Sequence, residues 1–163
     1  MQYAVGAIQF WWIWFKTCID ELGLEKALII EKKAEARWGQ FAVKLMKEIF
    51  QVPTGQDVIA FKQHWDTYAD IYDMKTTWLE VTSRKAVMII EHCPFWKQLP
   101  AEIKRHDEYK KAGFCALGCT LDIKNRARTI NPEMTVVLAK SVPRGDNYCE
   151  FIIECPSNRA RMK

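Results

Sequence analysis

The apolar residues of this chain change their spacing about halfway along it, and this change narrows the folds that the chain can adopt. Up to about residue 70 they recur at helical spacing, as Trp38, Phe41, Leu45 and Ile49 do on one expected face. From about residue 76, short runs of β-branched and apolar residues are separated by turn residues, a pattern typical of hairpins. Helices followed by paired antiparallel strands predict an α+β fold.

The predicted elements follow from this pattern and from the residues that start and stop it. Helices are expected over about residues 3–20, 24–50, 100–112 and 114–128. A further helix is expected to begin at a cap formed by Asp57, with Thr54 as a competing cap. Strands are expected over about 76–82, 85–92, 134–141 and 148–155. The expected architecture is N-terminal helices plus a four-stranded antiparallel sheet of two hairpins, covered by helices. We expect a single domain over 1–163, with a helical part at 1–70 and a strand-strand-helix-strand-strand part at 75–156.

Composition excludes several classes of partner. The net charge is only +4, and the one basic cluster (Arg159, Arg161 and Lys163) is expected to be a solvated tail. Because zinc-finger spacing and a Walker loop are also missing, we expect no nucleic-acid binding. The six cysteines are expected to be free thiols in a reducing cytoplasm, since the N-terminus does not read as a signal peptide.

Residues 8–15 contain three tryptophans and two phenylalanines. The segment is too short to span a membrane, which takes about 20 apolar residues. We expect a helix that is buried on most sides or packed in a homodimer. An interfacial membrane anchor is the alternative, but no Lys or Arg precedes Lys16 to attract anionic lipid.

Cys93, Cys119 and Cys149 are the candidate functional residues, because each lies near a carboxylate in a segment of its own. A thiol-based site, a metal site and buried packing are three interpretations, since free cysteine is among the most buried residue types. The wide spacing lacks a Cys-x-x-Cys knuckle, so we expect no metal site. The sequence does not identify a cofactor.

Side-chain periodicity brings these cysteines toward one place. Alternation along the last strand points Cys149 at the helices, and Cys115, Cys119, Asp122 and Arg126 form one stripe of a helix. We therefore expect Cys119, Cys149 and also Cys93 to meet Asp122 where helix and sheet join. Gly118 weakens its helix by about 1 kcal/mol relative to alanine and would let a strand or a ligand approach closely.

Some of these residues also have simpler interpretations. Asp122 and Arg126 are four residues apart and would form an ordinary surface pair. Asp146 follows Gly145 and suits a turn. His92 is the one histidine beside a candidate thiol, but alternation points it away from Cys93.

The second half of the chain resembles the L-2-amino-thiazoline-4-carboxylic acid hydrolase family, a mostly bacterial family with many uncharacterised members. The likeness covers about residues 76–155, and the first half agrees only in general character. It rests on Cys93-Pro94 after a strand, Cys119 with Asp122 on a helix, Asn131-Pro132, and Gly145-Asp146 leading to Cys149-Glu150-Phe151. The layout is also similar to vinyl-reductase-type small-molecule-binding domains, which are sensory modules.

The hydrolase resemblance implies opening of a cyclic amidine by cleavage of a C–N bond, as in 2-amino-thiazoline-4-carboxylate. This reaction requires a nucleophile or an activated water at the amidine carbon, and an acid for the departing nitrogen. On this basis Cys119 or Cys93 is expected to be the nucleophile and Asp122 the proton-transfer group. Arg126 is expected to clamp the substrate carboxylate, and Cys149 and Asp146 to complete substrate binding.

The aromatic content supports a rival interpretation. Seven tryptophans and eight phenylalanines in 163 residues suggest an apolar cleft between helices and sheet. The chain would then be a non-catalytic small-molecule-binding or sensory domain. Both interpretations predict a small molecule as the partner, and neither predicts association with a membrane.

Overall fold

The computed structural model describes residues 2–52, 55–99, 101, 104 and 114–156, with the backbone alone at 2–5 and 114–117. The competing cap Thr54, the helix start near Pro100, the divider Gly113 and the basic tail lie outside the described residues. So does the side chain of Cys115.

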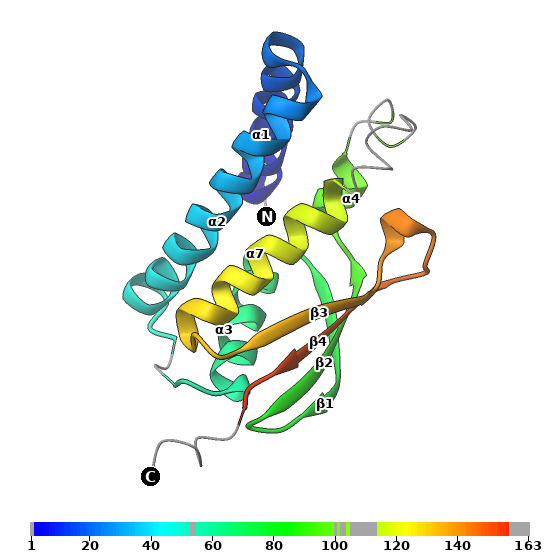
Figure 1. The fold of residues 1–163 in the computed structure, drawn as a ribbon. Coiled ribbons are helices and arrows are strands. Elements are labelled where there is room, and N and C mark those ends of the chain that lie inside the picture. The colour runs from blue at the N-terminus through cyan, green and yellow to red at the C-terminus, as the bar shows by residue number, and fades with distance from the viewer. Residues whose placement is uncertain (1, 53–54, 100, 102–103, 105–113, 157–163) are drawn as a thin grey trace.

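Three helices, a hairpin, two more helices and a second hairpin follow one another along the described chain (Figure 1). The helices are α1 (Gln2–Leu22), α2 (Leu24–Ile49), α3 (Val58–Ile71), α4 (Pro94–Gln98) and α7 (Phe114–Ile130). The strands are β1 (Lys75–Val81), β2 (Lys85–His92), β3 (Thr135–Lys140) and β4 (Cys149–Glu154). The predicted α+β fold with a four-stranded antiparallel sheet is confirmed.

Local chemistry explains where several elements begin and end. The Asp57 side chain accepts a hydrogen bond of 2.9 Å from the Ala60 N–H, so Asp57 is the cap of α3 as expected. Gly23 alone separates α1 from α2, and its φ of 78° is a conformation that glycine adopts most easily. The expected turn between β1 and β2 is closed by Thr82, whose hydroxyl accepts from the Lys85 N–H at 2.9 Å.

The strand order is β1-β2-β4-β3, so the second strands of the two hairpins pair at the centre of the sheet. One face of this sheet is buried under helices, and Figure 1 shows α7 lying between the sheet and α2. The inner face presents Ala86, Met88, Ile90, Phe151 and Ile153, all buried. This alternation agrees with the period-two pattern of the sequence.

The predicted apolar face of α2 is wrong. Phe41 and Ile49 are 52% and 63% exposed, whereas Gly39, Val43 and Met46 are buried against the rest of the molecule. The reason is the close packing of α2 on α7, where the smallest residue of α2 marks the nearest approach: a Cβ on Gly39 would lie 2.8 Å from the Asn125 Cβ. Larger apolar side chains are turned away from this contact.

The aromatic helix α1 buries only part of its surface. Ile8, Trp12 and Phe15 form a cluster with Ala27 and Leu99, while Phe10 and Ile13 are 71% and 66% exposed. Among the residues that the structure describes, no helix combines the length and the apolar character that a membrane span requires. The expected homodimer contact through this helix stays a prediction.

Candidate functional site

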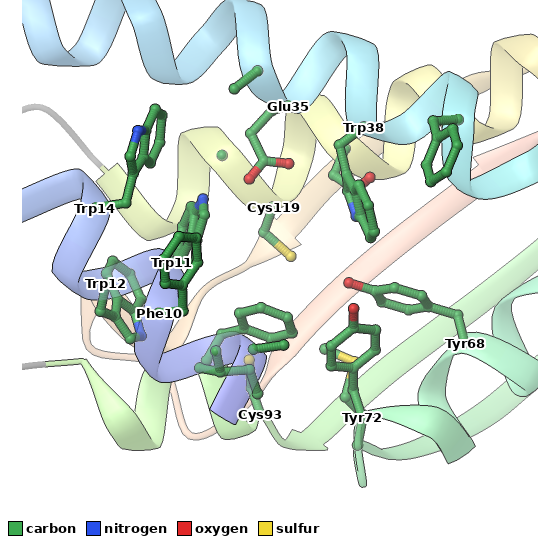
Figure 2. A pocket seen from close by; sticks show the side chains of 18 of the residues that line it. Phe10, Trp11, Trp12, Trp14, Glu35, Trp38, Tyr68, Tyr72, Cys93 and Cys119 are labelled. Atoms are coloured by element: carbon green, nitrogen blue, oxygen red, sulfur yellow. The ribbon is translucent and has the colours of Figure 1, made fainter. Parts of the chain in front are cut away.

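A cavity of about 570 Å³ lies between α1, α2, α7 and the end of α3. Half of its lining residues are aromatic. The aromatic lining consists of Phe10, Trp11, Trp12, Trp14, Trp38, Phe41, Trp65, Tyr68, Tyr72 and Phe95. Figure 2 shows the rings arranged around an open centre, with helices from distant parts of the sequence contributing to each side.

Rings from α1, α4 and the end of α3 contact one another along one wall of the cavity. The Trp11 and Phe95 rings meet edge to face with centroids 6.1 Å apart, and Phe95 lies 5.3 Å from Tyr72. The Tyr72 and Tyr68 centroids are 4.6 Å apart. Aromatic pairs favour this range of separations, so the wall is a packed surface that connects α1 to α3.

Few polar groups reach into the cavity. Glu35 extends from α2 between Trp11 and Trp38 and points toward Cys119, and the hydroxyl groups of Tyr68 and Tyr72 are directed inward from the opposite side (Figure 2). A largely apolar wall with a small number of convergent polar groups is typical of a site that binds and orients a small molecule.

A buried ion pair lies behind this wall. The Arg126 Nε donates to both carboxylate oxygens of Asp122, each at 2.8 Å. The guanidinium group also lies 3.8 Å from the centroid of the Tyr68 ring, a cation–π contact. Arg126 is completely buried and is not a lining residue, so its first role is to neutralise Asp122 and support Tyr68.

Two further carboxyl groups on α2 have no such partner. Glu31 is 2% exposed, and its carboxyl group lies against that of Glu35, so the two acids share a hydrogen bond that needs a proton. Burial raises the pKa of Glu31 to about 7. Burial, and then the charges of Asp122 and Glu31, raise the pKa of Glu35 well above its usual value. The surroundings of the cavity therefore favour the protonated form of both carboxyl groups more than water does.

Replacing Glu31 by glutamine is expected to stabilise the chain more at about pH 9 than at about pH 5. The folded carboxyl keeps its proton up to about pH 7, whereas in the unfolded chain it ionises near its ordinary pKa of 4.5. Raising the pH through this window therefore favours the unfolded chain, and glutamine removes that effect. The measurement is the difference in Tm between variant and parent as a function of pH.

Glu48→Gln is the matched control, because the Glu48 side chain is 62% exposed at the far end of the same helix. Its difference in Tm from the parent should stay nearly constant with pH. A constant difference for Glu31→Gln as well would contradict the prediction.

The three candidate cysteines come together at a second cavity of about 370 Å³. Cys93, Cys119 and Cys149 all line it, as does His92, and Cys93 and Cys119 also line the aromatic cavity. Cys93 follows the end of β2 and is the residue that precedes α4, so strand alternation no longer decides where it points. Cys93 and Cys119 therefore lie between the two cavities.

The environment of two of these sulfurs favours the thiol over the thiolate. Burial raises the pKa of Cys93 to about 11 and also raises the pKa of Cys149. The Cys149 Sγ accepts a hydrogen bond of 3.4 Å from the Val142 N–H. Nucleophilic cysteines require a lowered pKa, so neither position has the usual setting of an activated thiol. No group of three or more His, Cys, Asp or Glu side chains within the described ranges is arranged to hold a metal ion.

Asp146, the remaining predicted site residue, lies in neither cavity lining. Its carboxylate accepts from the Ser141 N–H at 2.7 Å and closes the loop before β4. Gly145 completes the turn with a φ of 102°. The geometry matches the simpler turn interpretation of Asp146, and its substrate-binding role stays a prediction.

Sequence reasoning missed Glu31 and Glu35. The signal was present, because both acids fall on the same helical stripe as Ala27, Trp38 and Ala42. Acidic residues among apolar ones on a stripe that must pack are candidates for a buried site. The aromatic residues of α1 and α3 give no comparable signal, since the sequence does not show that their rings surround one cavity.

No family model and no curated protein sequence matches this chain. Its fold resembles that of two solved structures. The phenol-responsive sensory domain of the transcription activator PoxR, with phenol, has a TM-score of 0.57 and 13% identity, and the match covers 90% of this chain and 73% of that one. Subunit 3 of the trafficking protein particle complex from Naegleria fowleri, covalently bound to palmitic acid, has a TM-score of 0.56 and 12% identity, covering 93% and 96%. At these identities the likeness establishes the fold alone.

Proposed function

We propose that this chain is a small-molecule-binding domain and that the aromatic cavity is its ligand site. The observation that carries the proposal is a cavity of about 570 Å³ with largely apolar walls, half of whose residues are aromatic, and few inward polar groups. Ligand sites in proteins have volumes of roughly 300–1,000 Å³ and linings of this kind. Two proteins with a similar fold hold phenol and palmitic acid, so this architecture accommodates apolar molecules elsewhere.

Replacing Gly118 by leucine is expected to weaken ligand binding at least about tenfold, because the new side chain would occupy the cavity. Gly118 lines the cavity, and a Cβ there would meet only the Glu31 Oε1, at 4.0 Å. Leucine is also a better helix former than glycine, so the variant should fold. The measurement is isothermal titration of parent and variant with phenethyl alcohol and with phenethylamine.

Gly118→Ala is the matched control, since one methyl group leaves most of the cavity open and the parent affinity should be retained. The proposal fails if the parent binds neither compound. It also fails if Gly118→Leu and the parent bind them equally well.

A hydrolytic function is the second candidate, and one observation favours it. Cys93, Cys119 and Asp122 line the same cavity, as the resemblance to the thiazoline hydrolases requires. Against it stand the raised pKa of Cys93 and the pairing of Asp122 with Arg126. Incubation with 2-amino-thiazoline-4-carboxylate separates the two functions. Turnover that is lost in Cys93→Ser or Cys119→Ser would favour the hydrolase, and ligand binding without turnover the binding domain.

A further inference from the structure

We propose that the ligand of the aromatic cavity is a compact apolar amine, positively charged at neutral pH, whose ammonium group lies against the Glu35 carboxylate. This proposal rests on the proposed binding function and names the chemical class of the ligand. Two features carry it: the aromatic faces around Glu35, and the excess of carboxyl groups over cations beside the cavity.

The rings around Glu35 suit a cation. Trp11 and Trp38 lie on either side of the carboxyl group, and the hydroxyl groups of Tyr68 and Tyr72 are directed toward the same space (Figure 2). The face of an aromatic ring is electron-rich and attracts ammonium groups, most strongly in a site shielded from water. A carboxylate in the same wall adds the opposite charge and accepts the N–H donors.

The charged groups that face Glu35 leave negative charge unbalanced. From α7, Asp122 and Arg126 face it as an ion pair made through the Arg126 Nε, while the Arg126 Nη1 and Nη2 have no hydrogen-bond partner among the described residues. From its own helix Glu31 lies one turn away. The lining residues from α1, α3 and α4 carry no charge at neutral pH. Arg37 also lines the cavity, but it is exposed to solvent, which screens its charge. Three carboxyl groups thus share one buried guanidinium.

Glu31 adds a buried acid to the excess of carboxyl groups over cations beside the cavity. Its enclosed carboxyl group has the Glu35 carboxyl group as its hydrogen-bonding neighbour, so the two acids share a proton rather than pairing with a cation. The Glu31 Oε1 lies 4.0 Å from the point where a Cβ on Gly118 would stand, immediately behind the cavity wall. A buried carboxylate without a partner is costly, so the cluster must hold protons or a cation. Burial raises the pKa of Glu31 to about 7 and the pKa of Glu35 well above its usual value, which favours protons in this role.

An ammonium group entering the cavity would replace one of these protons, which passes to the buffer. Binding of an amine should therefore release protons, and its affinity should increase as the pH rises through about 7, where Glu31 ionises. A neutral ligand leaves the carboxyl groups protonated, so its affinity should depend little on pH. An anionic ligand is repelled by the same groups.

The test uses three compounds that share a benzene ring: phenethylamine, phenethyl alcohol and phenylacetate. Isothermal titrations at about pH 6 and pH 8.5, each in two buffers of different ionisation enthalpy, give the affinities and the protons released. We expect phenethylamine to bind at least about tenfold more tightly than phenethyl alcohol at the higher pH, with proton release and a smaller difference at the lower pH.

Glu35→Gln keeps the shape of the side chain and removes its charge. The substitution should weaken the binding of phenethylamine at least about tenfold. It should change the affinity for phenethyl alcohol by less than about threefold. Glu48→Gln, on the exposed end of α2, should change neither. If Glu35→Gln does not fold, the pH dependence and proton release of the parent still decide the question.

Two results would overturn the proposal while leaving the binding function intact: phenethyl alcohol or phenylacetate binding as tightly as the amine at the higher pH, or amine binding that releases no proton. If none of the three compounds binds, the proposed function itself fails, and the amine proposal fails with it.

Discussion

Replacing Arg126 by methionine is expected to destabilise the chain by about 3–5 kcal/mol, the usual cost of leaving one member of a buried ion pair alone. Arg126 is completely buried, and its Nε holds both oxygens of Asp122 at 2.8 Å. Methionine keeps much of the apolar volume but leaves the Asp122 carboxyl without its partner. The contact with the Tyr68 ring is lost as well. Urea denaturation followed by circular dichroism measures the change.

Two further variants show whether the effect comes from the pair. Lys44→Met breaks a longer, exposed pair with Glu48, at 3.8 Å, and should cost less than about 1 kcal/mol. Removing both members with Asp122→Leu and Arg126→Met should recover much of the loss, because the uncompensated carboxyl group is then gone. A double variant as unstable as Arg126→Met would show that packing, not charge, is responsible.

Replacing Gly39 by alanine is expected to destabilise the chain by about 1–3 kcal/mol, although alanine is the better helix former. A Cβ at this position would lie 2.8 Å from the Asn125 Cβ, 3.1 Å from the Asp122 carbonyl oxygen and 3.3 Å from the Arg126 backbone nitrogen. Two of these three atoms belong to the backbone of α7, so α2 and α7 would have to separate. Thermal melts followed by circular dichroism test the prediction.

Gly118→Ala provides the contrast, since it changes the same residue type on the partner helix. Its Cβ has room, so the gain in helix propensity, up to about 1 kcal/mol, should appear as a higher Tm. The two substitutions should thus have opposite signs. A Tm that rises for Gly39→Ala would mean that the helices are not in contact at this point.

The fold was largely accessible from the sequence because its signals are local. The period-two alternation of Ala86, Met88 and Ile90 and the turn at Thr82 specify a hairpin without reference to the rest of the chain. The packed face of α2 was not accessible, because it depends on where α7 lies. Phe41 is exposed because α2 contacts α7 at Gly39, and a contact between two helices cannot be read from the sequence of one of them.

For the candidate site, too, the sequence predicted some features and not others. Helical spacing and strand alternation predicted that Cys119 and Cys149 point toward one junction, and the structure places both at one cavity together with Cys93, which lies beyond the end of β2. Their catalytic roles stay predictions, since the pattern says nothing about burial, which sets the pKa of a thiol. The aromatic cavity was not predicted as a site, because its walls come from five helices whose mutual arrangement no local signal encodes.

The aromatic cavity also separates two hydrophobic clusters, one around α1 and one under the sheet, that share Tyr72 and Phe95 at their border. An occupant that touches Trp12 on one side and Trp65 on the other would join them into a single cooperative unit. Detaching α1 from the body would then require releasing the ligand, which at a hundredfold excess over Kd adds about 2.7 kcal/mol. Ligand concentration would thus decide whether α1 opens alone or unfolds with the whole chain.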